Sequence, residues 1–154
     1  MELNDLIAPN AIVPLLKASS KKQVIQELSE KAARLTGLPQ RQIFDKLLQR
    51  ERLGSTGVGQ GVAIPHGKLA ELDRLWGIFA VLDKPVNYEA LDDQPVDIVF
   101  LLLAPEGAGA DHLKALARVA RVLRSPDTLA KLRSATDSDA IRAVLCEMER
   151  SDAA

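Results

Sequence analysis

The sequence predicts an α/β fold, a single layered domain in which helices cover a mixed sheet. Apolar runs of strand length alternate with segments of helical periodicity, as in layered α/β domains. Hydrophobic residues make up 47% of the chain but aromatic residues only 3%, so the core is expected to be aliphatic. A chain of 154 residues is long enough to bury a full core. We expect one domain over residues 1–150 and a polar tail over 151–154.

The N-terminal third predicts two helices. Ser20 and Gln23 have the spacing of a capping box, and one helical face is apolar from there until Gly37 stops the pattern. That face consists of Val24, Ile25, Leu28, Ala32 and Leu35. Pro39 suits the first turn of the second helix, whose polar end is Arg50-Glu51-Arg52. Its expected buried stripe is Ile43, Phe44, Leu47 and Leu48.

Residues 54–61, GSTGVGQG, hold four glycines in eight positions and are expected to form a loop. We call them the glycine segment. Buried strands are expected at 62–64, 75–82 and 96–104, and short edge strands at 11–13 and 86–88. Since Pro65 lacks a ladder donor, the first buried strand should end there, with His66 just past its end.

The last third predicts three helices. Asp111 is expected to cap the first of them, and its core-facing stripe should be Leu113, Leu116, Ala117, Ala120 and Leu123. A shorter helix begins at Ser125-Pro126 and ends near Arg133. Asp137 or Ser138 caps the last helix, whose apolar face is Ile141, Val144, Leu145 and Met148.

Composition excludes several classes of function. With 20 Lys+Arg against 21 Asp+Glu and few aromatic rings, the chain lacks the basic surface of a nucleic-acid-binding protein. The single Cys146 excludes an internal disulfide framework and a Cys-rich zinc site. The N-terminus lacks the pattern of a signal peptide, and the longest apolar run, 98–104, is far too short to cross a bilayer. We therefore expect a cytoplasmic protein with no nucleic-acid partner and no membrane insertion.

His66 is the strongest candidate for chemistry. It lies between Pro65 and Gly67 and follows the glycine segment, where backbone N–H groups in glycine-rich turns can form an anion site. A phosphoryl group is the ligand that suits such a site. The alternative is a histidine with only a structural role.

Nucleotide and metal sites are poorly supported. Gly54 and Gly59 have the spacing of a phosphate-binding loop, but Gln60-Gly61 stands where Lys and Ser/Thr are required. The two histidines, His66 and His112, lie 46 positions apart with no carboxylate motif between them. We expect no metal and no cofactor.

The segment from Arg50 to Leu69, RERLGSTGVGQGVAIPHGKL, resembles the phosphorylation site of the mannitol/fructose-type enzyme IIA domains of the bacterial phosphotransferase system. Within that family the likeness is to the nitrogen-regulatory branch. It extends over nearly the whole chain, through helices ahead of the motif, Gln94-Pro-Val-Asp97 at the start of a strand, and a histidine at the start of a helix, His112.

The resemblance implies a mostly mixed five-stranded sheet flanked by helices. It implies that His66 accepts a phosphoryl group from a phosphohistidine on a small carrier related to the histidine-containing phosphocarrier protein. Arg50 and His112 match the supporting residues of the family, and the glycine segment matches its phosphoryl-binding loop. The loop residues concerned are Ser55, Thr56, Gly57, Gly59 and Gly61. Regulated partners would be proteins such as transporters or sensor kinases.

These residue types suit phosphoryl transfer. A neutral imidazole is nucleophilic near pH 7, and the phosphorylated ring remains a competent leaving group. The planar fork of Arg50 can bond two phosphoryl oxygens. His112, in the first turn of a helix, can donate to them as a neutral ring. Alternatively, Arg50 is a solvated helix-end cation and His112 an exposed helix-start residue.

Three functions remain open at this stage. The first is a phosphocarrier that controls partner proteins through its phosphorylation state. The second is a binding module of the same fold in which phosphotransfer is vestigial. The third is a sugar-specific enzyme IIA that passes phosphate to a IIB domain. The presence of Arg50, the glycine segment, His66 and His112 together favours the first.

Overall fold

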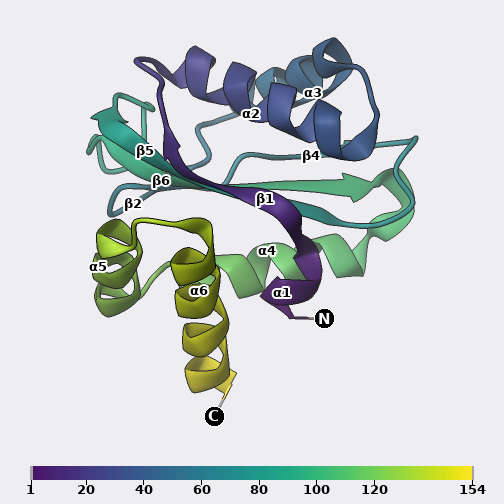
Figure 1. The fold of residues 1–154 in the computed structure, drawn as a ribbon. Helices are drawn as coiled ribbons and strands as arrows, with labels where there is room; N and C mark the ends of the chain where they lie inside the picture. Colours follow the sequence, from purple (N-terminus) through teal and green to yellow (C-terminus); the bar gives the residue numbers. More distant parts are fainter. Residues whose placement is uncertain (1, 154) are drawn as a thin grey trace.

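The computed structural model describes residues 2–153 and shows a sheet between two layers of helices (Figure 1). Helices α2 (Lys21–Thr36) and α3 (Gln40–Arg52) cover one face. The other face carries α1 (Leu3–Leu6), α4 (Ala110–Val122), α5 (Pro126–Ser134) and α6 (Ser138–Ala153). A short 3-10 helix, η1 (Glu106–Ala108), precedes α4. The tail expected over 151–154 lies outside the residues whose side chains are described.

The sheet is mixed, as predicted. Its strands are β1 (Ile7–Leu16), β2 (Gly57–Gly59), β3 (Val62–Ala63), β4 (His66–Leu69), β5 (Trp76–Val86) and β6 (Val96–Pro105). Their order is β1-β5-β6-β3-β2, and β4 pairs with β6 beyond β3. The β1/β5, β3/β6 and β4/β6 pairs are parallel, whereas β5/β6 and β2/β3 are antiparallel. Six strands therefore occupy five positions, since β3 and β4 follow each other along the same side of β6.

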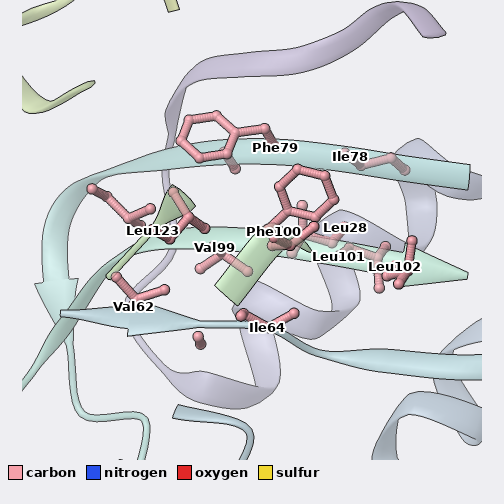
Figure 2. Packing of buried hydrophobic residues seen from close by; sticks show 14 of the residues in the cluster. Leu28, Val62, Ile64, Ile78, Phe79, Val99, Phe100, Leu101, Leu102 and Leu123 are labelled. Atoms are coloured by element: carbon pink, nitrogen blue, oxygen red, sulfur yellow. The ribbon is translucent and has the colours of Figure 1, made fainter. Parts of the chain in front are cut away.

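One hydrophobic cluster fills the space between the sheet and both helical layers. Strand β6 is its centre, because every residue from Ile98 to Ala104 is fully buried. Figure 2 shows Phe79 of β5 beside Phe100 of β6, and these rings meet edge to face with centroids 6.3 Å apart. Apart from these two rings and the buried Tyr88, the fully buried core is aliphatic, as the composition predicted. No helix within residues 2–153 is long and apolar enough to span a membrane.

The helix boundaries follow the predicted caps in most cases. Ser20 Oγ accepts from the Gln23 N–H at 3.1 Å, and Gly37 ends α2 in the left-handed conformation. The capping box is one-sided, because the Gln23 side chain accepts from Ser19 instead. At the other end of the chain Asp137 Oδ1 accepts from the Ala140 N–H at 2.8 Å and caps α6.

The predicted orientation of α4 is wrong. Its N-cap is Gly109 and not Asp111. The side chains that face the sheet are His112, Ala115, Val119 and Val122. Most of the predicted stripe faces away, and Leu113 is 69% exposed. The helix carries small and apolar residues on two faces, so periodicity alone did not identify the buried one.

Prolines limit the strands less than the sequence predicts. Strand β1 continues past Pro9 and Pro14, because an edge strand can leave a missing N–H on its unpaired side. Val86 ends β5, and no separate strand forms at 86–88. His66 lies past the end of β3, as predicted, but it also begins β4, since the Pro65 carbonyl accepts from the Leu102 N–H at 3.0 Å and pairing with β6 resumes.

Candidate functional site

One ring nitrogen of His66 is hydrogen-bonded to the backbone, and the other does not take part in that bond. The ring is half-buried, and its Nδ1 lies 2.9 Å from the Ile64 carbonyl oxygen. A carbonyl oxygen only accepts, so Nδ1 carries the hydrogen of this bond. In the neutral ring the lone pair is therefore on Nε2. The local backbone thus selects which nitrogen of His66 has a lone pair available for attack.

His112 lies beside His66, in the first turn of α4. The two ring centroids are 5.7 Å apart and the ring planes meet at 71°. His112 is only 5% exposed, and within residues 2–153 its buried Nε2 has no hydrogen-bond partner. Burial, followed by the charges of His66 and Lys68, lowers the pKa of His112 below the ordinary value for histidine. The ring is therefore neutral at pH 7 and retains an unused polar atom.

Arg50 approaches from the last turn of α3. Its Nη1 donates to the Gly54 carbonyl at 2.8 Å, which fixes one side of the guanidinium. Arg50, His66 and His112 line the same surface hollow of about 710 Å³. We call it the His66 hollow, and its other lining residues are Lys46, Gln49, Leu53, Gly67, Lys68, Glu106, Leu113 and Leu116. The structure thus brings together the three side chains that the sequence singled out.

Charge in the His66 hollow favours an anion. Three cationic side chains, Lys46, Arg50 and Lys68, face a single carboxylate, Glu106. Sequence reasoning missed Lys46, although it precedes Arg50 by four residues on the same helix and so shares its face. Two apolar side chains flank the hollow in an exposed position, with Leu53 84% and Leu113 69% accessible.

The glycine segment contains β2 and the turn into β3, and so forms the first arm and the turn of a short β2–β3 hairpin. None of Ser55, Thr56, Gly57, Gly59 and Gly61 lines the His66 hollow. Several of its N–H groups donate inside the protein, that of Thr56 to Glu51 at 3.0 Å and that of Gln60 to Asp92 at 3.0 Å. Direct contact of these residues with a phosphoryl group stays a prediction.

Close packing explains why glycine occupies positions 57 and 61. A Cβ at Gly57 would lie 2.7 Å from Ala90 Cβ, and one at Gly61 only 2.5 Å from Arg133 Nη2. Gly61 also has φ of +81°. The hairpin therefore fits closely against its neighbours while carrying the chain into β3, Pro65 and His66.

Comparison with known proteins decides the family. The family model for the phosphoenolpyruvate-dependent sugar phosphotransferase system, EIIA 2, matches residues 5–148. The chain belongs to this EIIA 2 family. The nitrogen regulatory protein of Bradyrhizobium diazoefficiens is 62% identical over 145 residues, 94% of this chain and 95% of that protein. The nitrogen regulatory protein of Escherichia coli K12 is 35% identical over 150 residues, 97% of this chain and 92% of that protein.

The EIIA 2 fold is also seen in a solved relative. The crystal structure of the nitrogen regulatory protein IIA-Ntr from Neisseria meningitidis superimposes with a TM-score of 0.89 at 34% identity. The superposition covers 93% of this chain and 98% of the solved chain. The predicted resemblance to the nitrogen-regulatory branch of the enzyme IIA family is thereby confirmed.

Proposed function

We propose that this EIIA 2 protein accepts a phosphoryl group on Nε2 of His66. The donor is a phosphohistidine on a small carrier protein related to the histidine-containing phosphocarrier protein. The observation that supports this most is the bond from His66 Nδ1 to the Ile64 carbonyl, because it leaves the Nε2 lone pair as the nucleophile. Residues 1–150 act together as the phosphocarrier domain, and we place it in the cytoplasm with its donor.

The transfer step needs no proton relay through His66. The P–N bond of the carrier breaks while the bond from phosphorus to Nε2 of His66 forms, and the carrier imidazole, which carries a hydrogen on its other nitrogen, leaves as a neutral ring with the electron pair. His66 keeps its Nδ1 hydrogen, bonded to Ile64, while the new bond forms, so its phosphorylated ring is first a cation that can then lose this hydrogen. Phosphoryl transfer then depends on positioning and on charge compensation.

The His66 hollow supplies that compensation. Arg50 stabilises the negative charge on the equatorial oxygens, and Lys46 and Lys68 add to the positive field. His112 Nε2, when it carries the hydrogen, donates to a phosphoryl oxygen and gains the partner it lacks. Because the low pKa of His112 keeps its ring neutral, it assists without competing for a proton.

Leu53 and Leu113 suit the docking of a protein donor. Exposed apolar side chains around a charged centre are typical of a protein–protein contact. Both side chains line the same hollow as His66, and the charge of a phosphoryl group there acts over a Debye length of about 8 Å. Addition of the phosphoryl charge therefore changes how a docked partner is bound, and we propose that this state controls partners such as transporters or sensor kinases.

A sugar-specific role is the second candidate. The fructose-specific EIIABC component of Bacillus subtilis is 34% identical over 142 residues, which are 92% of this chain but 22% of that larger protein. A sugar-specific enzyme IIA passes its phosphoryl group to a IIB domain. A binding module without transfer is the third candidate, and the unpartnered His112 Nε2 argues against it.

Mass spectrometry after incubation with a phosphorylated histidine carrier tests the proposal. The wild-type protein should gain one phosphoryl group and His66→Ala none, with unchanged circular dichroism. Subsequent incubation with purified IIB domains separates the first two candidates, because onward transfer at a comparable rate supports the sugar-specific role. A wild-type protein that gains no mass contradicts the proposed function.

A further inference from the structure

Glu51 is a buried carboxylate next to the site residue Arg50. Its side chain is only 4% exposed and pairs with Lys21, whose Nζ lies 3.0 Å from Oε1. It also accepts hydrogen bonds from the backbone and the hydroxyl of Thr56, and the Tyr88 hydroxyl donates to Oε2 at 3.4 Å. We call Lys21, Glu51, Thr56 and Tyr88 the Glu51 network. The sequence placed Glu51 on a polar helix end, whereas the structure buries it.

The Glu51 network joins four parts of the chain. Lys21 begins α2, Glu51 belongs to the last turn of α3, Thr56 precedes β2, and Tyr88 follows β5. Burial and the charge of Glu51 raise the pKa of Tyr88, so its hydroxyl remains a neutral donor. The Lys21 ammonium lies 4.8 Å from the centroid of the Tyr88 ring. A buried charge is costly unless it is paired and hydrogen-bonded, as Glu51 is here.

Arg50 and Glu51 hold the same turn from two sides. The Arg50 guanidinium donates to the Gly54 carbonyl at 2.8 Å, while the Glu51 carboxylate accepts from the Thr56 N–H at 3.0 Å. Gly54 itself has φ of +150° and an N–H that donates to the Glu51 carbonyl at 3.1 Å. The position of the Gly54 carbonyl, which orients Arg50, therefore depends on the Glu51–Thr56 contact.

We propose that Glu51 is a positioning residue for phosphoryl transfer. Through Thr56 it fixes the Gly54 carbonyl, and this carbonyl aims the Arg50 guanidinium at the His66 hollow. This inference rests on the proposed function of His66. Loss of the Glu51 carboxylate releases the turn, so Arg50 samples orientations that do not meet the phosphoryl group.

A double-mutant cycle in transfer kinetics tests the inference. The rate of phosphorylation is measured against donor concentration for wild type, Glu51→Ala, Arg50→Ala and the double variant. Glu51→Ala should lower the maximal rate by about tenfold and leave the half-saturating donor concentration within about twofold. In the Arg50→Ala background the same change should cost less than about twofold, because its effect passes through Arg50.

The matched control is Glu30→Ala, which removes an exposed carboxylate paired with Arg34 on α2. It should transfer at the wild-type rate. Circular dichroism and thermal unfolding show whether Glu51→Ala folds. If it does not, Thr56→Val takes its place, because it removes the hydroxyl contact but keeps the backbone N–H. Thr56→Val should lower the transfer rate less than Glu51→Ala does, and this loss should also disappear in the Arg50→Ala background.

Two results overturn the inference alone. One is a wild-type rate in the folded Glu51 or Thr56 variant. The other is a loss of the same size with and without Arg50, which would indicate a general structural role. A wild-type protein that accepts no phosphoryl group is a different result, because it refutes the proposed function and this inference with it.

Discussion

Three side chains of different chemistry meet in the His66 hollow, and each arrives from a different element. His66 comes from the start of β4, Arg50 from the end of α3 and His112 from the start of α4. The imidazole that we propose as the nucleophile is held by its own backbone, through the Ile64 carbonyl. In the proposed step Arg50 and His112 act on the oxygens of the transferred group.

We expect the Arg50→Ala and His112→Ala variants to accept a phosphoryl group still, but more slowly than the wild type. Loss of one charge-assisted contact costs about 1.5–3 kcal/mol of transition-state stabilisation, which is roughly tenfold to somewhat over a hundredfold in rate. Stopped-flow or quench-flow transfer from one donor gives the rates. Lys17→Ala, outside the hollow, is the control, and wild-type rates in both site variants would assign them no part in the step.

The low pKa of His112 predicts a pH-dependent stability. Burial, His66 and Lys68 disfavour its protonation in the folded state, while the unfolded chain protonates near the ordinary value of about 6.5. Below about pH 6.5 the unfolded state binds more protons, so the free energy of unfolding falls as pH falls. Above that pH the contribution is constant.

Denaturant unfolding of wild type and His112→Gln from about pH 5 to 8 measures this effect. The stability of the wild type relative to the variant should decrease as the pH drops below about 6.5. If the difference in stability between wild type and His112→Gln does not change with pH over this range, the predicted effect of His112 is contradicted.

The side chains that meet in the His66 hollow were predictable where a motif marked them. His66, Arg50 and His112 were identified from the sequence, and the structure brings them together. The burial of Glu51 was not predictable, because its partners Lys21, Thr56 and Tyr88 come from distant positions. Between Arg50 and Arg52 a carboxylate has the pattern of a solvated helix end.

At the scale of elements, the sequence predicted which segments are helices and strands better than which way they face. Helix α2 begins and ends at its predicted caps and buries its predicted face. Helix α4 was placed correctly, but its buried face was not, because apolar residues occur on two sides. The wrong face is informative, since it contains the exposed Leu113 beside His66.

A pair of matched truncations tests the observed orientation of α4. Val119 is fully buried, so Val119→Ala should lower the free energy of unfolding by about 1.5–3 kcal/mol. Leu113→Ala should change it by less than about 0.5 kcal/mol, because its side chain faces outward. Urea unfolding of both variants gives the values. A larger loss for Leu113 than for Val119 would place the predicted stripe against the sheet after all.

At the scale of the whole molecule, the site is built on paired and packed elements. His66 begins a strand paired with β6, the centre of the core, and both helix ends at the hollow belong to packed helices. A phosphoryl group adds about two negative charges at neutral pH. Their effect extends about 8 Å at physiological salt, so it reaches the rim of the hollow and a docked partner.

Phosphorylation is therefore expected to act as a local change of charge without refolding. Amide spectra of the unmodified and phosphorylated protein should differ around His66, Arg50, Lys68 and the start of α4. Resonances of α5 and α6, on the face away from α3, should stay in place. Shifts spread through those helices would show a global rearrangement.

The site of attachment tests the central claim most directly. Nitrogen-15 and phosphorus-31 NMR of the phosphorylated protein, recorded at alkaline pH because phosphohistidine is labile in acid, identifies the nitrogen that bears phosphorus. We predict phosphorus on Nε2 of His66, because the Ile64 carbonyl holds Nδ1 and leaves the Nε2 lone pair free to attack. Phosphorus on Nδ1 of His66, or on His112, would contradict the account.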